Sequence, residues 1–237
     1  MKIIYPYFQN SETDYARLRN VFEKSARRHM PDAELVCIHL SYARIDEDKH
    51  DLTTRAFLAK INALRTCVDD VVIVADCDLF FSGSVSPILK GITTTVCVTD
   101  RENYKYKWNS GFFVAKTTDK NIPQFVLEWE YETRRLYAGR NRPQDKKLIK
   151  ENGGIDQAAL SLVTQNTKEK FSFVPTRILN ACQSDWANTD ELTKVYHIKS
   201  GLRKIVLDPK KEQGELYLKA HVRVQEIARM WWAEENR

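Results

Sequence analysis

Short apolar runs alternate with segments of helical periodicity along the first third of the chain. The apolar runs are residues 2–5, 34–40 and 71–76, and between them lie 11–30 and 51–68, where apolar side chains recur at helical spacing. Strands joined by helices of this length need crossover connections, which favour parallel pairing. The pattern therefore predicts an α/β fold whose sheet is mixed, mostly parallel and flanked by helices.

The remainder of the chain continues this alternation. We expect helices at 122–139 and 155–165, a loop at 140–154, and one helix over the tail, 214–237. The sequence contains no internal repeat and no linker, so a single domain is expected. Further strands are expected at 93–100, 110–116, 171–174 and 195–198.

Composition limits the compartment and the partners. No stretch approaches the roughly 18 apolar residues of a membrane-spanning helix, and the chain opens directly on a strand-like run rather than on a signal pattern. The five cysteines are an odd number without a C-x-x-C pair, which argues against a thiolate zinc site. We therefore expect a cytoplasmic protein, in the host cytoplasm if it is viral. The net charge of +5 permits an anionic partner without requiring one.

Two aspartates end the apolar strand at 71–76, in "VVIVADCDLFF". Ligands of a parallel sheet bind at the carboxyl ends of its strands. Carboxylate oxygens are ligands that a hard divalent cation prefers. Asp76 and Asp78 are thus candidate metal ligands. Two alternatives remain at this point: a solvated acidic turn, and a haloacid dehalogenase-like phosphatase in which Asp76 would be the nucleophile.

Three later segments carry polar groups suited to a binding site. "WNSG" offers Asn109 and Ser110 beside a glycine that permits close backbone approach. "GGIDQ" places Asp156 at the start of a helix, where an acidic residue is often only a helix cap. His197, in "VYHIKSGLRK", is a candidate metal ligand, although a lone histidine is more often an ordinary polar residue.

The order of these segments resembles the GT-A nucleotide-sugar glycosyltransferases. The resemblance covers about residues 1–205 and is carried by D-x-D, W-N-S-G, G-G-x-D-Q, N-A-C in "PTRILNAC", and the final histidine segment. It is closest to the retaining family 8 type, which includes glycogenin and lipopolysaccharide galactosyltransferases. The resemblance implies a Rossmann-like GT-A domain with a nucleotide-binding half at 1–100, a donor and acceptor half at 101–205, and a helical tail at 206–237.

The resemblance also implies an activity and a set of roles. The chain would move a sugar from a nucleotide sugar, most simply a UDP-sugar, to an acceptor hydroxyl with retention, using Mn²⁺ or Mg²⁺. Asp76, Asp78 and His197 would hold the metal, and Asp156 and Gln157 would lie at the reaction centre. The implied donor contacts are Tyr5 and Tyr7 near the base, Lys60 on phosphate or sugar, Asn109, Ser110 and Gly111 at the sugar, and Gly201 and Lys204 at the diphosphate.

The sequence departs from the family in its last motif. The family reads H-x-x-G-x-x-K-P-W, whereas three residues separate His197 from Gly201, and Ile205 and Val206 stand in place of Pro-Trp. The usual Asp-Ala-Asp is also Asp-Cys-Asp here. These departures concern the alignment of Gly201 and Lys204 and leave the wider GT-A resemblance intact.

Two segments rich in Lys and Arg, 134–150 and 199–211, suggest an anionic acceptor. Candidates are hydroxymethylated pyrimidines in viral DNA, whose binding would be salt-dependent, and a phosphorylated glycan such as lipopolysaccharide. A solvated basic surface is the ordinary explanation for such segments. A catalytically inactive module that binds nucleotide sugar or nucleic acid is a further alternative to an enzyme.

Overall fold

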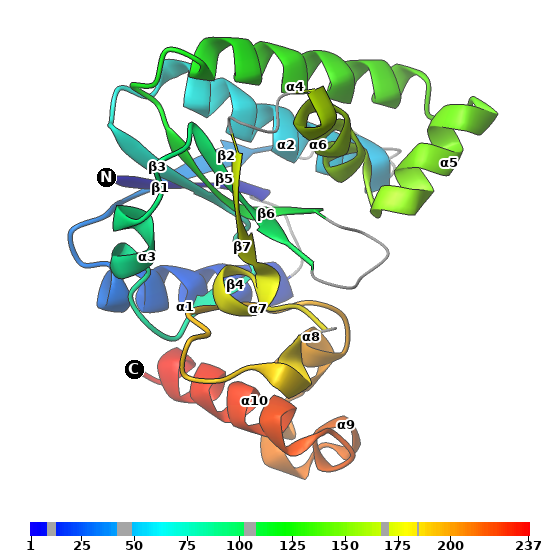
Figure 1. Ribbon diagram of the computed structural model, residues 1–237. Coiled ribbons are helices and arrows are strands. Elements are labelled where there is room, and N and C mark those ends of the chain that lie inside the picture. The colour runs from blue at the N-terminus through cyan, green and yellow to red at the C-terminus, as the bar shows by residue number, and fades with distance from the viewer. Residues whose placement is uncertain (9–12, 42–48, 102–107, 167–170, 184) are drawn as a thin grey trace. The chain divides into compact units, whose positions relative to one another are not determined.

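The structure is a computed structural model that describes residues 1–8, 13–41, 49–101, 108–166, 171–183 and 185–237 (Figure 1). Its contacts group the chain into two compact units, and the chain passes between them several times. The first unit comprises Met1–Asn10, Glu34–Asp76 and Gly91–Val174, and the second Ser11–Ala33, Cys77–Lys90 and Pro175–Arg237. The division of one domain at 100 and 205 stays a prediction.

The first unit is built on a six-stranded sheet in the order β2-β1-β3-β6-β5-β7. β1 pairs in parallel with β2 and with β3, while β6 runs antiparallel to β3 and to β5. The predicted mixed α/β fold is confirmed. The strands are β1 (Lys2–Phe8), β2 (Glu34–Leu40), β3 (Val71–Ala75), β5 (Val96–Asp100), β6 (Trp108–Lys116) and β7 (Phe171–Pro175).

Helices of the first unit pack on this sheet through an apolar core. The sheet supplies residues such as Val72, Val74 and Phe113 to the same buried cluster as the helices. Trp129 lies at the centre of an aromatic group, with its ring centroid 4.6 Å from that of Phe57. The helices are α2 (Lys49–Thr66), α4 (Ile122–Ala138), α5 (Pro143–Asn152) and α6 (Ile155–Asn166), seen beside the sheet in Figure 1.

The predicted loop at 140–154 is wrong, because helix α5 occupies most of it. Pro143 stands in the first turn, where its fixed φ suits a helix start. Gly153 ends the helix in the left-handed conformation, with φ 79°. This helix was not predicted because its segment is mostly basic and polar. Only two adjacent apolar residues, Leu148 and Ile149, pack into the core.

The second unit combines a small sheet with helices. β4 (Leu79–Phe81) pairs antiparallel with β8 (Val195–His197), and α1 (Thr13–His29) packs against β4. Leu18 and Val21 of α1 share a buried cluster with Ile227 and Trp231 near the C-terminus. The remaining elements are α3 (Ser86–Lys90), α7 (Thr176–Leu179), α8 (Ser200–Leu207), α9 (Glu215–Leu218), α10 (Val222–Glu235) and the 3-10 turns Trp186–Asn188 and Lys211–Gln213.

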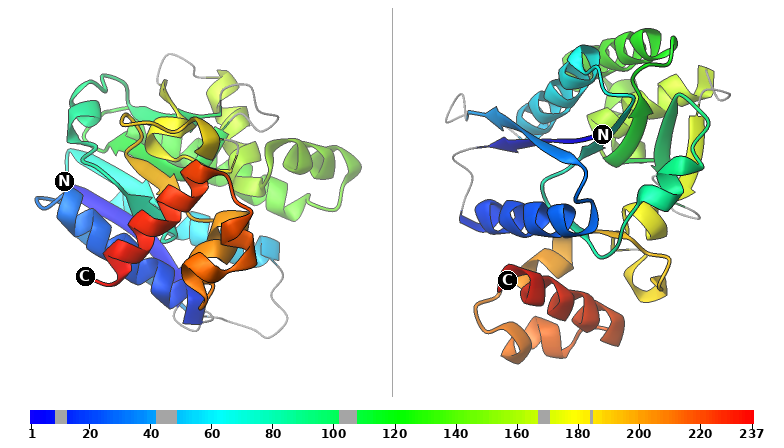
Figure 2. Two further views of the ribbon diagram at one scale, coloured as in Figure 1. Left: turned by 90° about the horizontal axis from the view of Figure 1, so that it is seen from below. Right: turned by 90° about the vertical axis from the view of Figure 1, so that its left-hand side faces the viewer.

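The predicted single helix over 214–237 is also wrong. It is divided into α9 and α10, which lie beside α8 (Figure 2). His221 has an extended backbone, and its imidazole accepts a hydrogen bond from the Arg223 amide, so it caps α10. Gln225 donates to the carbonyls of Tyr217 and Ala220, which satisfies the end of α9. This local capping outweighs helix propensity across the junction.

Candidate functional site

Asp76 ends β3, and its backbone amide donates to the Gly111 carbonyl at 2.8 Å. Its carboxylate forms an ion pair with Lys60 of α2, whose side chain is only 5% exposed. A buried ammonium needs a partner of opposite charge. The predicted site residue Lys60 therefore lies at the D-x-D segment, where it balances the charge of Asp76.

The register between β4 and β8 places His197 beside Asp78. Leu79 pairs with His197, and the amide of Ile198 donates to the Asp78 carbonyl at 2.8 Å. Through this pairing, two residues more than a hundred positions apart become neighbours. His197 Nε2 lies 3.1 Å from Asp78 Oδ1, and both side chains are nearly buried.

Asn180 fixes the orientation of the histidine ring. Its Oδ1 lies 3.0 Å from His197 Nδ1, and Asn180 is fully buried. An amide oxygen can only accept, so Nδ1 carries the proton in this hydrogen bond. Nε2 is then the nitrogen that can offer a lone pair to a metal, as is common where a second group orients a ligating histidine. Asn180 belongs to the "NAC" segment of the sequence resemblance.

Arg203 of α8 binds the other oxygen of Asp78. Its Nη2 pairs with Asp78 Oδ2, Nη1 donates to the Tyr15 hydroxyl at 2.8 Å, and Nε donates to the Ile198 carbonyl at 3.1 Å. Burial would raise the pKa of Asp78, but His197, Arg203 and Lys199 outweigh that effect and hold the pKa well below its usual range. Asp78 is therefore a carboxylate at neutral pH, as a metal ligand must be.

Sequence reasoning missed Arg203, because the left-handed backbone of Ser200 cannot be seen in the sequence. Counting from His197, the third and sixth residues of the family motif fall on Ser200 and Arg203. Ser200 has φ 52°, the left-handed conformation that favours glycine, whereas a Cβ at Gly201 would meet nothing within 4 Å. The backbone of Ser200, rather than that of Gly201, therefore has the conformation that suits a glycine position.

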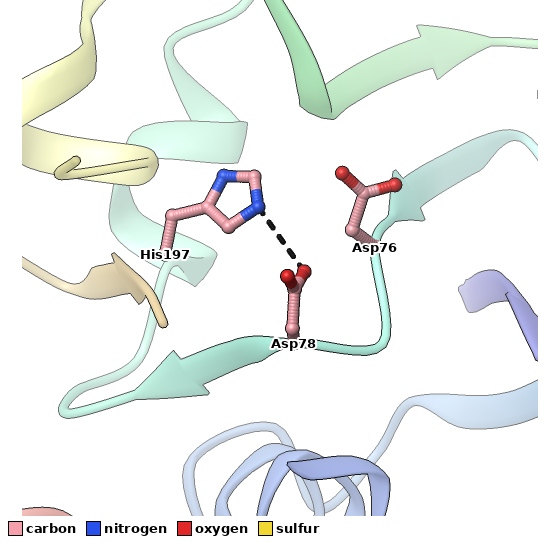
Figure 3. Close-up of side chains that lie close together, drawn as sticks. All are labelled: Asp76, Asp78 and His197. Atoms are coloured by element: carbon pink, nitrogen blue, oxygen red, sulfur yellow. Dashed lines mark ion pairs between the residues drawn. The ribbon is translucent and has the colours of Figure 1, made fainter. Parts of the chain in front are cut away.

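Asp76, Asp78 and His197 form a group that could bind a metal ion (Figure 3). Each offers a ligand atom within 4.8 Å of the others. Two carboxylates and an imidazole suit Mn²⁺ or Mg²⁺, so the residues present fit the predicted cation.

In the first unit, the structure brings together Ser110 of β6 and Asp156 of α6. The Ser110 hydroxyl donates to Asp156 Oδ2, and the Trp129 indole donates to the Asp156 carbonyl at 3.1 Å. The amide nitrogen of Asn109 and the amide oxygen of Gln157 are buried without a hydrogen-bond partner among the described residues. Asn109 Oδ1 accepts from the Gly111 amide. Buried unpaired polar atoms such as these are expected where a polar ligand binds.

Other predicted site residues are placed without a test of their roles. Tyr5 and Tyr7 lie on β1 and are 2% and 6% exposed. Lys204 is exposed on α8, and Gly201 lies in the first turn of the same helix. Their assignment to the nucleotide and the diphosphate stays a prediction.

The fold is that of the GT-A glycosyltransferases, as solved structures show. A galactosyltransferase, LgtC, in complex with donor and acceptor sugar analogues, has 13% identity and a TM-score of 0.58, covering 99% of this chain and 100% of its own. A glycosyltransferase involved in glycosylation of the major capsid of PBCV-1 has 11% identity and a TM-score of 0.59, covering 84% and 93%. The glycosyltransferase GlyE of Streptococcus pneumoniae TIGR4 has 12% identity and a TM-score of 0.60. That match covers 100% of this chain and 61% of GlyE.

Comparison by sequence adds nothing to this, since no protein-family model and no curated protein matches the chain. The GT-A fold predicted from the motif order is confirmed by the structural matches. Within the described ranges, no helix is long and apolar enough to cross a membrane.

Proposed function

We propose that the protein is a metal-dependent glycosyltransferase that moves a sugar from a UDP-sugar to an acceptor hydroxyl, with retention of configuration. The observation that carries the proposal is the Asp78–His197 pair, with Asn180 presenting His197 Nε2 as a ligand. The GT-A fold supports this function over a haloacid dehalogenase-like phosphatase. A location in the cytoplasm is part of the proposal.

Asp76, Asp78 and His197 would hold Mn²⁺ or Mg²⁺, which would offset the negative charge of the leaving diphosphate. The other residues would bind and orient the donor. Asn109 and Gln157 bring unpaired buried amide atoms that suit sugar hydroxyls. Ser110 holds Asp156 through its hydroxyl, so that this carboxylate keeps one orientation beside the developing positive charge on the sugar.

The remaining predicted contacts belong to the same proposal. Lys60 would bind donor phosphate or sugar, Gly111 would lie along the sugar, and Tyr5 and Tyr7 would lie near the nucleotide base. Lys204 and Gly201 would contact the diphosphate, together with Arg203 at the lysine position of the motif.

A screen of nucleotide-sugar hydrolysis, with and without Mn²⁺, tests the proposed activity. We expect Mn²⁺-dependent release of UDP, and we expect Asp78→Ala to abolish it because the carboxylate between His197 and Arg203 is lost. Asp32→Ala, which removes an exposed carboxylate from the same unit, is the matched control and should retain the activity. Full Mn²⁺-dependent hydrolysis by folded Asp78→Ala would rule out the assignment. UDP and Mn²⁺ binding without turnover on any donor would favour an inactive binding module.

For the acceptor, we propose an anionic molecule, with hydroxymethylated pyrimidine DNA and a phosphorylated glycan as the two candidates. Within 134–150, Arg134 and Arg135 are engaged with Glu130, Glu132 and Asp145. Lys147 pairs with Glu151, and the other exposed cations of α5 and its N-cap recur at four-residue spacing, which puts them on one helix face. They are Arg142, Lys146 and Lys150.

Binding measured against salt concentration separates the acceptors. Phosphate contacts to DNA make affinity fall steeply with salt, and the triple variant Arg142→Gln, Lys146→Gln, Lys150→Gln should weaken that binding and flatten its salt dependence. Transfer of sugar onto hydroxymethylated DNA would establish this acceptor. If the protein fails to retard DNA even at low salt, the DNA candidate is excluded and the phosphorylated glycan is favoured.

A further inference from the structure

Each carboxylate of the D-x-D segment already has a protein cation of its own. Lys60 pairs with Asp76 within the first unit, and Arg203 pairs with Asp78 within the second. In each pair the carboxylate contributes a formal charge of −1 and the basic side chain +1, so the pair sums to zero. The two carboxylates expected to attract a divalent cation are therefore neutralised by side chains of the same chain.

Both pairs are held firmly. Lys60 is 4% exposed, so its ammonium has little access to water and depends on Asp76. Arg203 is fixed by three acceptors, because it also donates to the Tyr15 hydroxyl and the Ile198 carbonyl. Its guanidinium lies over the Tyr15 ring, 4.8 Å from the centroid. These contacts hold the Arg203 guanidinium in one position beside Asp78.

A carboxylate whose charge is balanced by a neighbouring basic side chain attracts a divalent cation weakly. We propose that Lys60 and Arg203, each through the carboxylate it pairs with, set a low affinity of the protein alone for a divalent cation, and that a diphosphate ligand raises this affinity by engaging Arg203. This inference rests on the proposed function and deepens it. It makes Arg203 a control that couples cation binding to diphosphate binding.

Phosphate is the anion that these side chains are suited to bind. A guanidinium presents a planar fork of donors that matches phosphate oxygens, and an ammonium binds phosphate as a point charge. The side chain of Arg203 is 26% exposed, so a ligand can reach it. Once a diphosphate shares Arg203, Asp78 binds metal more strongly. By linkage, the metal strengthens diphosphate binding by the same factor.

Titration of the full-length protein with Mn²⁺, alone and with saturating UDP, tests this coupling by electron paramagnetic resonance. In the wild type, we expect weak binding of Mn²⁺ alone and much tighter binding with UDP. In Arg203→Gln, the affinity for Mn²⁺ alone should rise about tenfold, which is 1.4 kcal/mol, and the enhancement by UDP should fall by a similar factor. Lys60→Gln should raise the affinity for Mn²⁺ alone through Asp76, and serves if Arg203→Gln does not fold.

Two control variants sharpen the test. Arg229→Gln removes an exposed arginine of α10 and makes the same change in net charge, so it should leave Mn²⁺ affinity unchanged. Arg203→Lys keeps the positive charge and should keep the affinity for Mn²⁺ alone close to that of the wild type. In thermal denaturation, Mn²⁺ alone should raise the Tm of Arg203→Gln more than that of the wild type, because the ion replaces the lost partner of Asp78.

The outcomes distinguish this inference from the proposed function. A wild-type protein that binds neither Mn²⁺ nor UDP contradicts the proposed function itself. A wild type that binds both, together with unchanged or weaker affinity for Mn²⁺ alone in folded Arg203→Gln and Lys60→Gln, overturns the coupling and leaves the proposed function standing.

Discussion

Replacing Asn180 should weaken the proposed metal site without touching any of its ligands. In Asn180→Ala, the hydrogen bond of 3.0 Å to His197 Nδ1 is lost and a buried ring nitrogen loses this partner. An unsatisfied buried polar group costs about 1–3 kcal/mol of the free energy of unfolding. Removing a group that orients a metal ligand typically reduces metal affinity by about 10–100-fold, and we expect a loss of that size for Mn²⁺ in the presence of UDP.

The assay combines urea denaturation, followed by circular dichroism, with Mn²⁺ titration of each variant. Asn180→Asp keeps an acceptor oxygen facing His197 and should retain more of the Mn²⁺ affinity than Asn180→Ala. Asn188→Ala, an exposed position in the same unit, should change neither quantity. The reasoning is refuted if folded Asn180→Ala binds Mn²⁺ within about twofold of the wild type, since His197 would then need no orienting partner.

Two further predictions concern stability. Gly153→Ala should lower the free energy of unfolding by about 1 kcal/mol, because φ at this position is 79°. Gly201→Ala should be neutral or stabilising, because a Cβ there has open space. Equal losses of unfolding free energy in urea denaturation would contradict this. Burial, aided by Arg28, lowers the pKa of His29 despite an opposing effect of Glu234, so the unfolded chain binds the proton more readily and stability should decline as pH falls below about 6.5. Urea denaturation at pH 7.5 and 5.5 should show a smaller pH effect in His29→Gln, and an undiminished effect would show that His29 does not contribute.

Long periodic segments made most of the fold predictable from the sequence. β2 is observed at Glu34–Leu40, as expected, and the expected strands at 93–100 and 195–198 differ from β5 and β8 by a few residues at their ends. Helix α5 was not predicted, because its packed side shows only one apolar pair among basic residues. The break between α9 and α10 depends on a histidine cap, which is a weak signal in a sequence.

Most residues of the candidate site could be predicted from the sequence, but the contacts between them could not. Asp76 and Asp78 follow a buried strand, so a site at that strand end could be inferred directly. His197 was a candidate ligand by itself, but its grouping with the aspartates came only from the family resemblance, because β4 and β8 have three residues each and show no usable alternation. The charge-balancing role of Arg203 depends on the pairing of distant strands and on the left-handed conformation of Ser200, which no local pattern reveals.

The core of the second unit has a consequence for the order in which the protein can fold during synthesis. Leu18 and Val21 share a buried cluster with Ile227 and Trp231, which are made long after them. The first unit needs only residues up to Val174, so its sheet can be complete while the ribosome still holds the tail. Helix α1 can pack on β4 early, but the part of its apolar face that packs on α10 stays uncovered until α10 is made, which is a state exposed to aggregation. A chaperone that binds exposed apolar surface during synthesis would therefore find this part of α1 until α10 emerges.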